Sequence, residues 1–121
     1  MPIKNILIVD DSPTDRQHLS DMLAKSGYKV SAVASAEEAL AKVKQAKPDL
    51  VLMDVVMPGQ NGFQATRTLT SDDATKHIPV IICSTKGQET DRVWGLRQGA
   101  KDYIVKPIKQ ADLIAKIAAL G

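Results

Sequence analysis

Short apolar runs, separated by longer segments with helical features, most constrain how this chain can fold. Four runs are continuous and mostly aliphatic, at residues 6–9, 50–53, 80–83 and 103–105. Such runs are typical of β-strands that are covered on both faces. A fifth segment, residues 28–33, alternates more between apolar and polar side chains, which suits a strand at the edge of a sheet.

Helix signals occupy the intervening segments. Ser12 followed by Pro13 predicts the start of a helix, and Gly27 predicts its end. Ser35 and Glu38 have the spacing of a capping box, which predicts a second helix that stops at residues 47–48.

Three further helices are predicted in the C-terminal half of the chain. They cover residues 62–71, residues 87–98 and an apolar stripe at residues 113, 114, 117 and 120. In the 87–98 helix we expect Val93 and Leu96 to face the core, with Gly99 ending the helix.

Five strand–helix repeats predict an α/β, doubly wound (βα)5 fold with a parallel sheet and helices on both faces. The 121 residues amount to one domain, and we expect residues 1–121 to form it without an output domain. Ligands of such folds bind outside the carboxyl ends of the strands.

Composition excludes several other classes of protein. Aromatic residues make up only 3%, and the net charge is +2, so the composition argues against nucleic-acid binding and against membrane insertion. Residues 1–60 carry seven Lys and Arg against eight Asp and Glu, whereas residues 61–121 carry nine against six. A lone cysteine, Cys83, forms no internal disulfide, and the N-terminus is no signal peptide. We therefore expect a cytoplasmic protein.

Polar residues stand where the strands are expected to end. Asp10 and Asp11 follow the first run, Asp54 follows the third strand, and Ser84 follows the fourth. Lys106 follows the last. In a parallel sheet these carboxyl ends share one edge, so we expect the side chains to converge, although any one aspartate alone could be an ordinary loop residue.

The convergence of three carboxylates, a hydroxyl and an ammonium predicts phosphoryl-transfer chemistry. Oxygen ligands at an edge open to water suit Mg²⁺, with Asp10 and Asp11 as its natural holders. A carboxylate can also attack phosphorus, and Asp54, alone at its strand end, is the natural nucleophile. Lys106 and the Ser84 hydroxyl can neutralise and bind the moving group.

At these positions the chain resembles the receiver domains of CheY-like response regulators. The similarity covers the whole chain, and its motifs are at residues 8–12, 52–58, 59–62, 80–84 and 99–107. It implies the flavodoxin-like strand order 2-1-3-4-5. Two segments without chemistry of their own, residues 61–67 and 85–95, are further similar to the PilH type of regulator in type IV pilus twitching-motility systems.

The resemblance implies roles for individual residues. Asp54 would accept phosphate from a sensor histidine kinase, such as a CheA-like kinase, or from a phosphotransfer domain. Asp11, Asp54 and the Val56 carbonyl would hold Mg²⁺, with Asp10 acting through water. Ser84 and Lys106 would contact the phosphoryl oxygens.

The resemblance also implies a switch. Tyr103 would move inward when Ser84 is drawn to the phosphate, and the signal would leave through the 87–98 helix, the last strand and the last helix. The Lys106–Pro107 bond is expected to be cis.

Three positions depart from the commonest receiver pattern or lie on the expected path of the hydrolytic water. Thr85 replaces a smaller residue, Val56 often has a polar counterpart, and Lys86 lies two residues past Ser84. Val56 cannot orient a water, which predicts slow self-dephosphorylation; the alternative is that Val56 only packs its loop.

Several alternatives stay open at this point. Trp94, among polar helix neighbours, either marks a partner surface or folds over nearby aliphatic chains. His18 and His77 are expected to be ordinary surface residues. The chain could act as an effector or as a phosphate sink, as a monomer or a weak dimer. The enzymatic alternative is an aspartate-based Mg²⁺ phosphatase, in which the nucleophile would follow the first strand.

Overall fold

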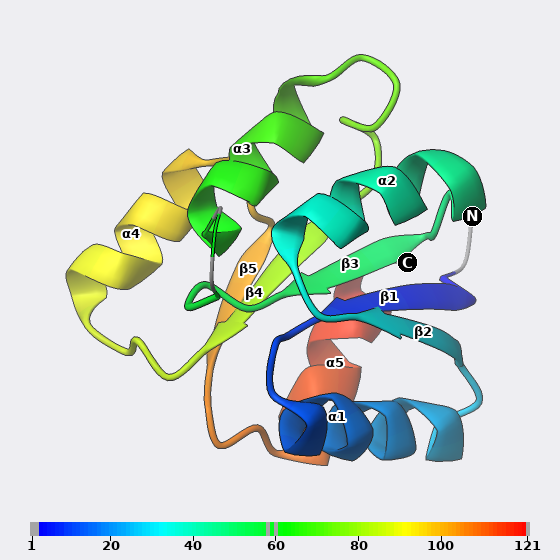
Figure 1. The fold of residues 1–121 in the computed structure, drawn as a ribbon. Helices are drawn as coiled ribbons and strands as arrows, with labels where there is room; N and C mark the ends of the chain where they lie inside the picture. Colours follow the sequence, from blue (N-terminus) through cyan, green and yellow to red (C-terminus); the bar gives the residue numbers. More distant parts are fainter. Residues whose placement is uncertain (1–2, 58, 60, 121) are drawn as a thin grey trace.

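The computed structural model describes residues 3–57, 59 and 61–120, in which strands and helices alternate along the chain (Figure 1). The elements are β1 (Asn5–Val9), α1 (Pro13–Lys25), β2 (Lys29–Val33), α2 (Ala36–Ala46), β3 (Leu50–Met53), α3 (Gly62–Ser71), β4 (Val80–Ser84), α4 (Glu89–Arg97), β5 (Asp102–Val105) and α5 (Gln110–Leu120). Pro58, part of one receiver-like motif, lies outside the described residues.

The five strands form one parallel sheet in the order β2-β1-β3-β4-β5. This confirms the predicted fold class and strand order. The chain moves outward from β1 in both directions, so the order reverses between β1 and β3. The carboxyl ends of these two strands are therefore where a ligand site is expected.

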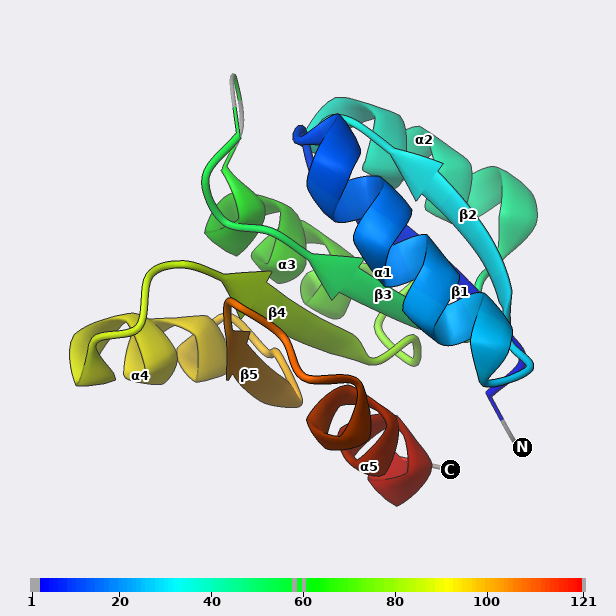
Figure 2. The same ribbon diagram turned by 90° about the horizontal axis from the view of Figure 1, so that it is seen from below.

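Two apolar layers hold the helices against the sheet. On one face, Ile8 and Leu52 of the central strands pack with side chains of α1 and α5, and on the other face Val9 and Met53 pack with α2 and α3. Figure 2, seen from below, shows α1 and α5 together on the first of these faces. The continuous apolar runs are thus explained by burial on both sides. No helix in the described part of the chain is both long and apolar enough to cross a membrane.

The helix starts follow the predicted capping signals, with one exception. The Ser12 hydroxyl accepts a hydrogen bond from the Asp15 amide at 3.3 Å, as an N-cap does. Ser35 caps α2 in the same way, but the Glu38 carboxylate accepts from the Ala34 amide and not from Ser35. The predicted box is therefore only half formed, because Glu38 reaches one residue further back.

The prediction that Val93 and Leu96 of α4 face the core is wrong. These side chains are 41% and 44% exposed, and the buried residue of α4 is Gly95. A Cβ atom at position 95 would lie 2.8 Å from Ile82 Cδ1 and 3.0 Å from Tyr103 Cδ2. The helix backbone thus lies directly on these two side chains, which leaves no room for a larger residue and turns the apolar residues outward.

Replacing Gly95 with alanine is expected to destabilise the fold by about 1–3 kcal/mol, because the added methyl overpacks the contact with Ile82 and Tyr103. Helix propensity alone would favour the opposite sign, by about 0.5–1 kcal/mol. Urea denaturation measures the difference. Thr90→Ala, at an exposed position of the same helix, is the control and should leave stability unchanged or slightly raised. A stabilised Gly95→Ala protein would show that the contact has room to spare.

Candidate functional site

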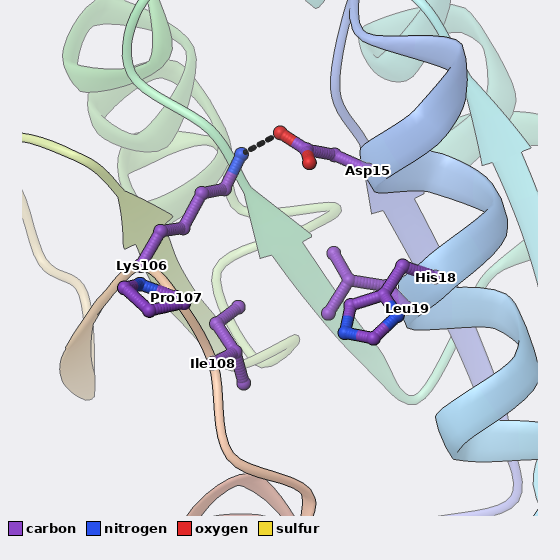
Figure 3. A pocket seen from close by; sticks show the side chains of 6 residues that line it. All are labelled: Asp15, His18, Leu19, Lys106, Pro107 and Ile108. Carbon is purple, nitrogen blue, oxygen red and sulfur yellow. Dashed lines mark hydrogen bonds and ion pairs between the residues drawn. The ribbon is translucent and has the colours of Figure 1, made fainter.

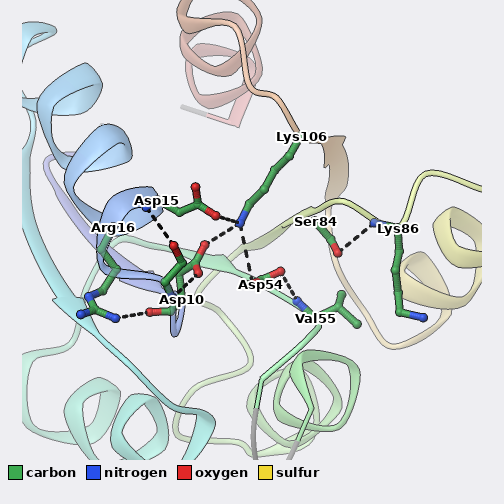
Figure 4. A network of polar contacts seen from close by, with 9 residues as sticks. Asp10, Asp15, Arg16, Asp54, Val55, Ser84, Lys86 and Lys106 are labelled. Carbon is green, nitrogen blue, oxygen red and sulfur yellow. Dashed lines mark hydrogen bonds and ion pairs between the residues drawn. The ribbon is translucent and has the colours of Figure 1, made fainter.

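The structure brings together three carboxylates at the carboxyl edge of the sheet. Figure 4 shows two of them, Asp10 and Asp54, with the lysine between them. Asp10 and Asp11 directly follow β1, and Asp54 directly follows β3. Oxygen atoms of the three side chains all lie within 4.8 Å of one another. Asp10 is 1% exposed and Asp54 8%, whereas Asp11 is open to solvent. The neighbouring parallel strands β1 and β3 thus place the negative charges that the sequence predicted at this edge.

Lys106, directly after β5, supplies the positive charge of the cluster. Its Nζ atom lies 2.6 Å from Asp10 Oδ2, 2.8 Å from Asp15 Oδ2 and 3.7 Å from Asp54 Oδ2. Burial opposes the charged form, but the hydrogen bonds that Lys106 donates to Asp10 and Asp15 outweigh it and hold the pKa of Lys106 above its ordinary value. The lysine is therefore a permanent cation among four carboxylates.

Backbone contacts fix the two buried carboxylates. The Ser12 amide donates to Asp10 Oδ1 at 3.0 Å, and the Val55 amide donates to Asp54 Oδ1 at 2.8 Å. Arg16 Nη1 donates to the Asp10 carbonyl at 2.7 Å. At position 62 a Cβ atom would lie 1.9 Å from the Asp54 carbonyl oxygen, so only glycine allows the start of α3 to pack against this residue. The loop after β3 therefore holds Asp54 at the sheet edge.

Asp54 is the carboxylate whose proton affinity changes most clearly. Burial raises its pKa to about 6, with a further contribution from Asp10, while Lys106 opposes the shift. An acid with this pKa is ionised at neutral pH but only by a modest margin. An additional cation beside Asp54 would therefore stabilise its ionised form.

Ser84 and Tyr103 form a second polar group next to the carboxylates. Ser84 is fully buried at the end of β4, and its hydroxyl accepts a hydrogen bond from the Lys86 amide at 3.2 Å. Tyr103 is 1% exposed, and its hydroxyl donates to the Lys86 carbonyl at 2.6 Å. The tyrosine ring is thus already inside, where the resemblance implied that it would move on activation.

The remaining sequence candidates lie around the rim. Val56 is 54% exposed, and Thr85 and Lys86 are also exposed. His18 and His77 are exposed, as expected of surface residues. Burial raises the pKa of the Cys83 thiol to about 12, which leaves it inert.

Asp15 is the site residue that the sequence did not single out. It lies in the first turn of α1, where an acidic residue normally has a helix-dipole explanation. Its carboxylate instead reaches Lys106, at one end of a cavity of about 100 Å³ that also touches Leu19 and Ile108 (Figure 3). The Lys106–Pro107 bond beside it is cis, as the resemblance implied.

The donor set fits a hard divalent cation. The cluster offers carboxylate oxygens only, one of them solvent-exposed, and Asp54 ionises less readily than usual without further positive charge. Mg²⁺ prefers oxygen ligands and keeps several waters, which an edge open on the Asp11 side allows. A carboxylate beside such a cation and a fixed lysine can act as a nucleophile toward phosphorus, because the charges of the incoming group are neutralised.

The fold and this edge define the class of protein: a doubly wound α/β domain with an acidic pocket and a lysine at the carboxyl edge of its sheet. Comparison with known proteins gives the family. The chain belongs to the response regulator receiver domain family, whose model matches residues 6–118.

Individual relatives agree with this assignment. The chain is 56% identical to the protein PilH of Pseudomonas aeruginosa over 95% of both chains. It is 38% identical to the phosphate regulon transcriptional regulatory protein PhoB of the same organism, over 97% of this chain and 51% of that protein. Among solved structures, the chemotaxis response regulator CheY4 of Vibrio cholerae superposes with a TM-score of 0.90 at 30% identity, over 98% of this chain and 99% of that chain. The resemblance to CheY-like receivers and to PilH is therefore confirmed.

The raised pKa of Asp54 predicts that Mg²⁺ binding weakens in acid. Below about pH 6 the cation must displace a proton from this carboxyl, so the affinity should fall roughly fivefold between pH 6 and 5 and level off above pH 7. Isothermal titration calorimetry measures the affinity. Asp54→Asn is the control and should bind weakly without a step near pH 6. A wild-type affinity that is constant from pH 5 to 7 would contradict the prediction.

Proposed function

We propose that this protein is a response regulator that accepts a phosphoryl group on Asp54. Receiver domains as a family receive phosphate from histidine kinases. The observation that carries the proposal for this chain is the position of Asp54, within reach of Lys106 Nζ at 3.7 Å and clustered with Asp10 and Asp11. The donor is a phosphohistidine of a CheA-like sensor kinase or of a phosphotransfer domain.

In this proposal a carboxylate oxygen of Asp54 attacks phosphorus, the P–O bond forms, and the P–N bond to the donor imidazole breaks. The electron pair of the broken bond stays on the imidazole nitrogen, which takes its proton from solvent. Asp11, Asp54 and the Val56 carbonyl would hold Mg²⁺, with Asp10 acting through water, and the cation would supply charge neutralisation. The buried Val55 amide keeps the Asp54 carboxylate oriented.

Lys106 and Ser84 would change partners when the phosphoryl group arrives. Lys106 would leave Asp15 for a phosphoryl oxygen, and the Ser84 hydroxyl, which now accepts from the Lys86 amide, would turn to donate. Tyr103 shares the Lys86 backbone with Ser84, so its hydrogen bond would be disturbed too. The proposed switch is therefore a rearrangement at the start of α4 in which the tyrosine repacks from an already buried position.

The signal would then leave through the face formed by α4, β5 and α5. Apolar side chains of α4 and β5 are exposed, with Trp94 51% and Val105 37% accessible. Exposed apolar residues of this size mark contact surfaces. They favour a protein target for this domain, acting as an effector, over a role as phosphate sink.

The similarity to PilH supports placing this receiver in a type IV pilus twitching-motility system or a chemotaxis-like one, in the cytoplasm, as a monomer or weak dimer. Val56, Thr85 and Lys86 are exposed around Asp54, where water would approach the phosphoryl group. An aliphatic Val56 cannot hold that water, so the proposed phosphorylated state is long-lived.

Incubation with acetyl phosphate and Mg²⁺, followed by intact mass spectrometry, tests the proposal. Wild type should gain one phosphoryl group, and Asp54→Ala should gain none because the nucleophile is lost. Asp21→Ala, at an exposed position of α1, is the matched control and should react like wild type. Phosphorylation of Asp54→Ala to the wild-type level would refute the assignment.

After the donor is removed, Val56→Asn should lose phosphate about fivefold faster than wild type, which is the rate effect of one hydrogen bond to the attacking water.

The ion pair with Asp15 predicts that Lys106 is restrained in the resting state. Asp15→Asn removes the charge with little change in shape, so Lys106 should move more readily toward Asp54 and phosphorylation by acetyl phosphate should accelerate. The Asp15 side chain is 43% exposed, which limits the pair to about 1 kcal/mol and the gain to about fivefold. The initial rate by mass spectrometry measures it, with Asp21→Asn as control. A rate that falls would mean that Asp15 helps to position the lysine.

A further inference from the structure

A second polar cavity lies at the opposite edge of the sheet from Asp54. It has a volume of about 320 Å³ and is formed by the last residues of α3 and α4 and by the segments that lead into β4 and β5. Its lining contains four basic side chains and no carboxylate; the basic residues are Arg67, Lys76, Arg97 and Lys101. These are four of the nine Lys and Arg residues of the C-terminal half, and they account for much of its positive excess.

Most of this positive charge is unpaired. Lys76 forms a surface ion pair with Asp73 at 2.9 Å. Arg67, Arg97 and Lys101 have no acidic partner in the described part of the chain. Like charges that share one cavity repel each other, so the arrangement favours a bound anion.

Helix dipoles do not account for the cluster. Arg97 lies in the last turn of α4, where a cation stabilises the helix, but α3 has no basic residue in its last turn. Arg67 lies earlier in α3, and Lys76 and Lys101 lie outside helices. Three of the four cations are therefore left without this explanation.

Hydrogen bonds connect the elements that line this cavity. The Thr70 hydroxyl donates to the Gln98 carbonyl at 2.6 Å, which ties the end of α3 to the end of α4. The Lys101 amide donates to the Val80 carbonyl at 2.8 Å and fixes the backbone of the third unpaired cation. Backbone that is already held by such hydrogen bonds loses less entropy when the cavity binds a ligand.

We propose that this cavity binds a small phosphate-bearing anion. Two guanidinium groups offer paired N–H donors that match phosphate oxygens, and Lys101 adds a compact charge. The volume is that of a small ligand site and suits a group of one or two phosphates. The site shares no residue with the Asp54 edge, so it does not depend on the proposed phosphoryl transfer.

Titration with inorganic pyrophosphate in EDTA tests the proposal, because without divalent cations the acidic edge repels the probe. Calorimetry should show one molecule bound per chain, and ¹⁵N-resolved amide shifts should be largest around residues 97–101. The double variant Arg67→Gln/Arg97→Gln should lose at least about tenfold in affinity, since each arginine contributes charge-assisted hydrogen bonds. Citrate, a carboxylate anion of similar charge, should bind more weakly than pyrophosphate.

Lys25→Gln/Lys29→Gln removes two exposed charges elsewhere and is the matched control, expected to bind like wild type. Thermal melting checks the fold of each variant, and Lys101→Met provides an independent test if the double variant is unstable. Asp54→Ala should keep full pyrophosphate affinity, which separates this site from the phosphoacceptor. No binding to wild type, equal loss in the control, or equal affinity for citrate would overturn the proposal.

Discussion

Repulsion among the carboxylates at the sheet edge is the constraint on which the rest of the site depends. Asp10, Asp11 and Asp54 lie within 4.8 Å of one another, and Lys106 is the cation that meets two of them. One ammonium cannot neutralise three carboxylates, and the pKa of the buried Asp54 stays raised despite it. The site is therefore short of positive charge, and a divalent cation is what would supply it.

The sequence predicted the fold and the main site residues because both depend on strands. Short apolar runs mark buried parallel strands, and the residue after each run must lie at the common edge, which located Asp10, Asp54, Ser84 and Lys106. Asp15 was missed because its spacing is that of an ordinary first-turn acid. Its contact with Lys106 depends on how α1 lies beside the β5–α5 loop, which no local pattern records.

The error in α4 has a different cause. Amphipathic patterns assume that the larger apolar residues of a helix face the core. Here the inner face carries Gly95, because Ile82 and Tyr103 already fill the space, and Val93, Trp94 and Leu96 point to solvent. With its apolar residues facing outward, α4 offers them to a partner but packs less apolar surface against the sheet.

The attachment of α4 to the rest of the domain involves little buried apolar surface and depends on hydrogen bonds at both ends of the helix. Within the described residues, α1, α2, α3 and α5 each bury aliphatic side chains, whereas α4 buries only Gly95. Before α4, the Tyr103 hydroxyl donates a hydrogen bond to the Lys86 carbonyl. After α4, the Thr70 hydroxyl donates one to the Gln98 carbonyl. Elements with little buried apolar surface have the lowest cost of local rearrangement. Because one contact adjoins Ser84 and the other adjoins the basic cavity, α4 is the element on which events at either edge of the sheet can act.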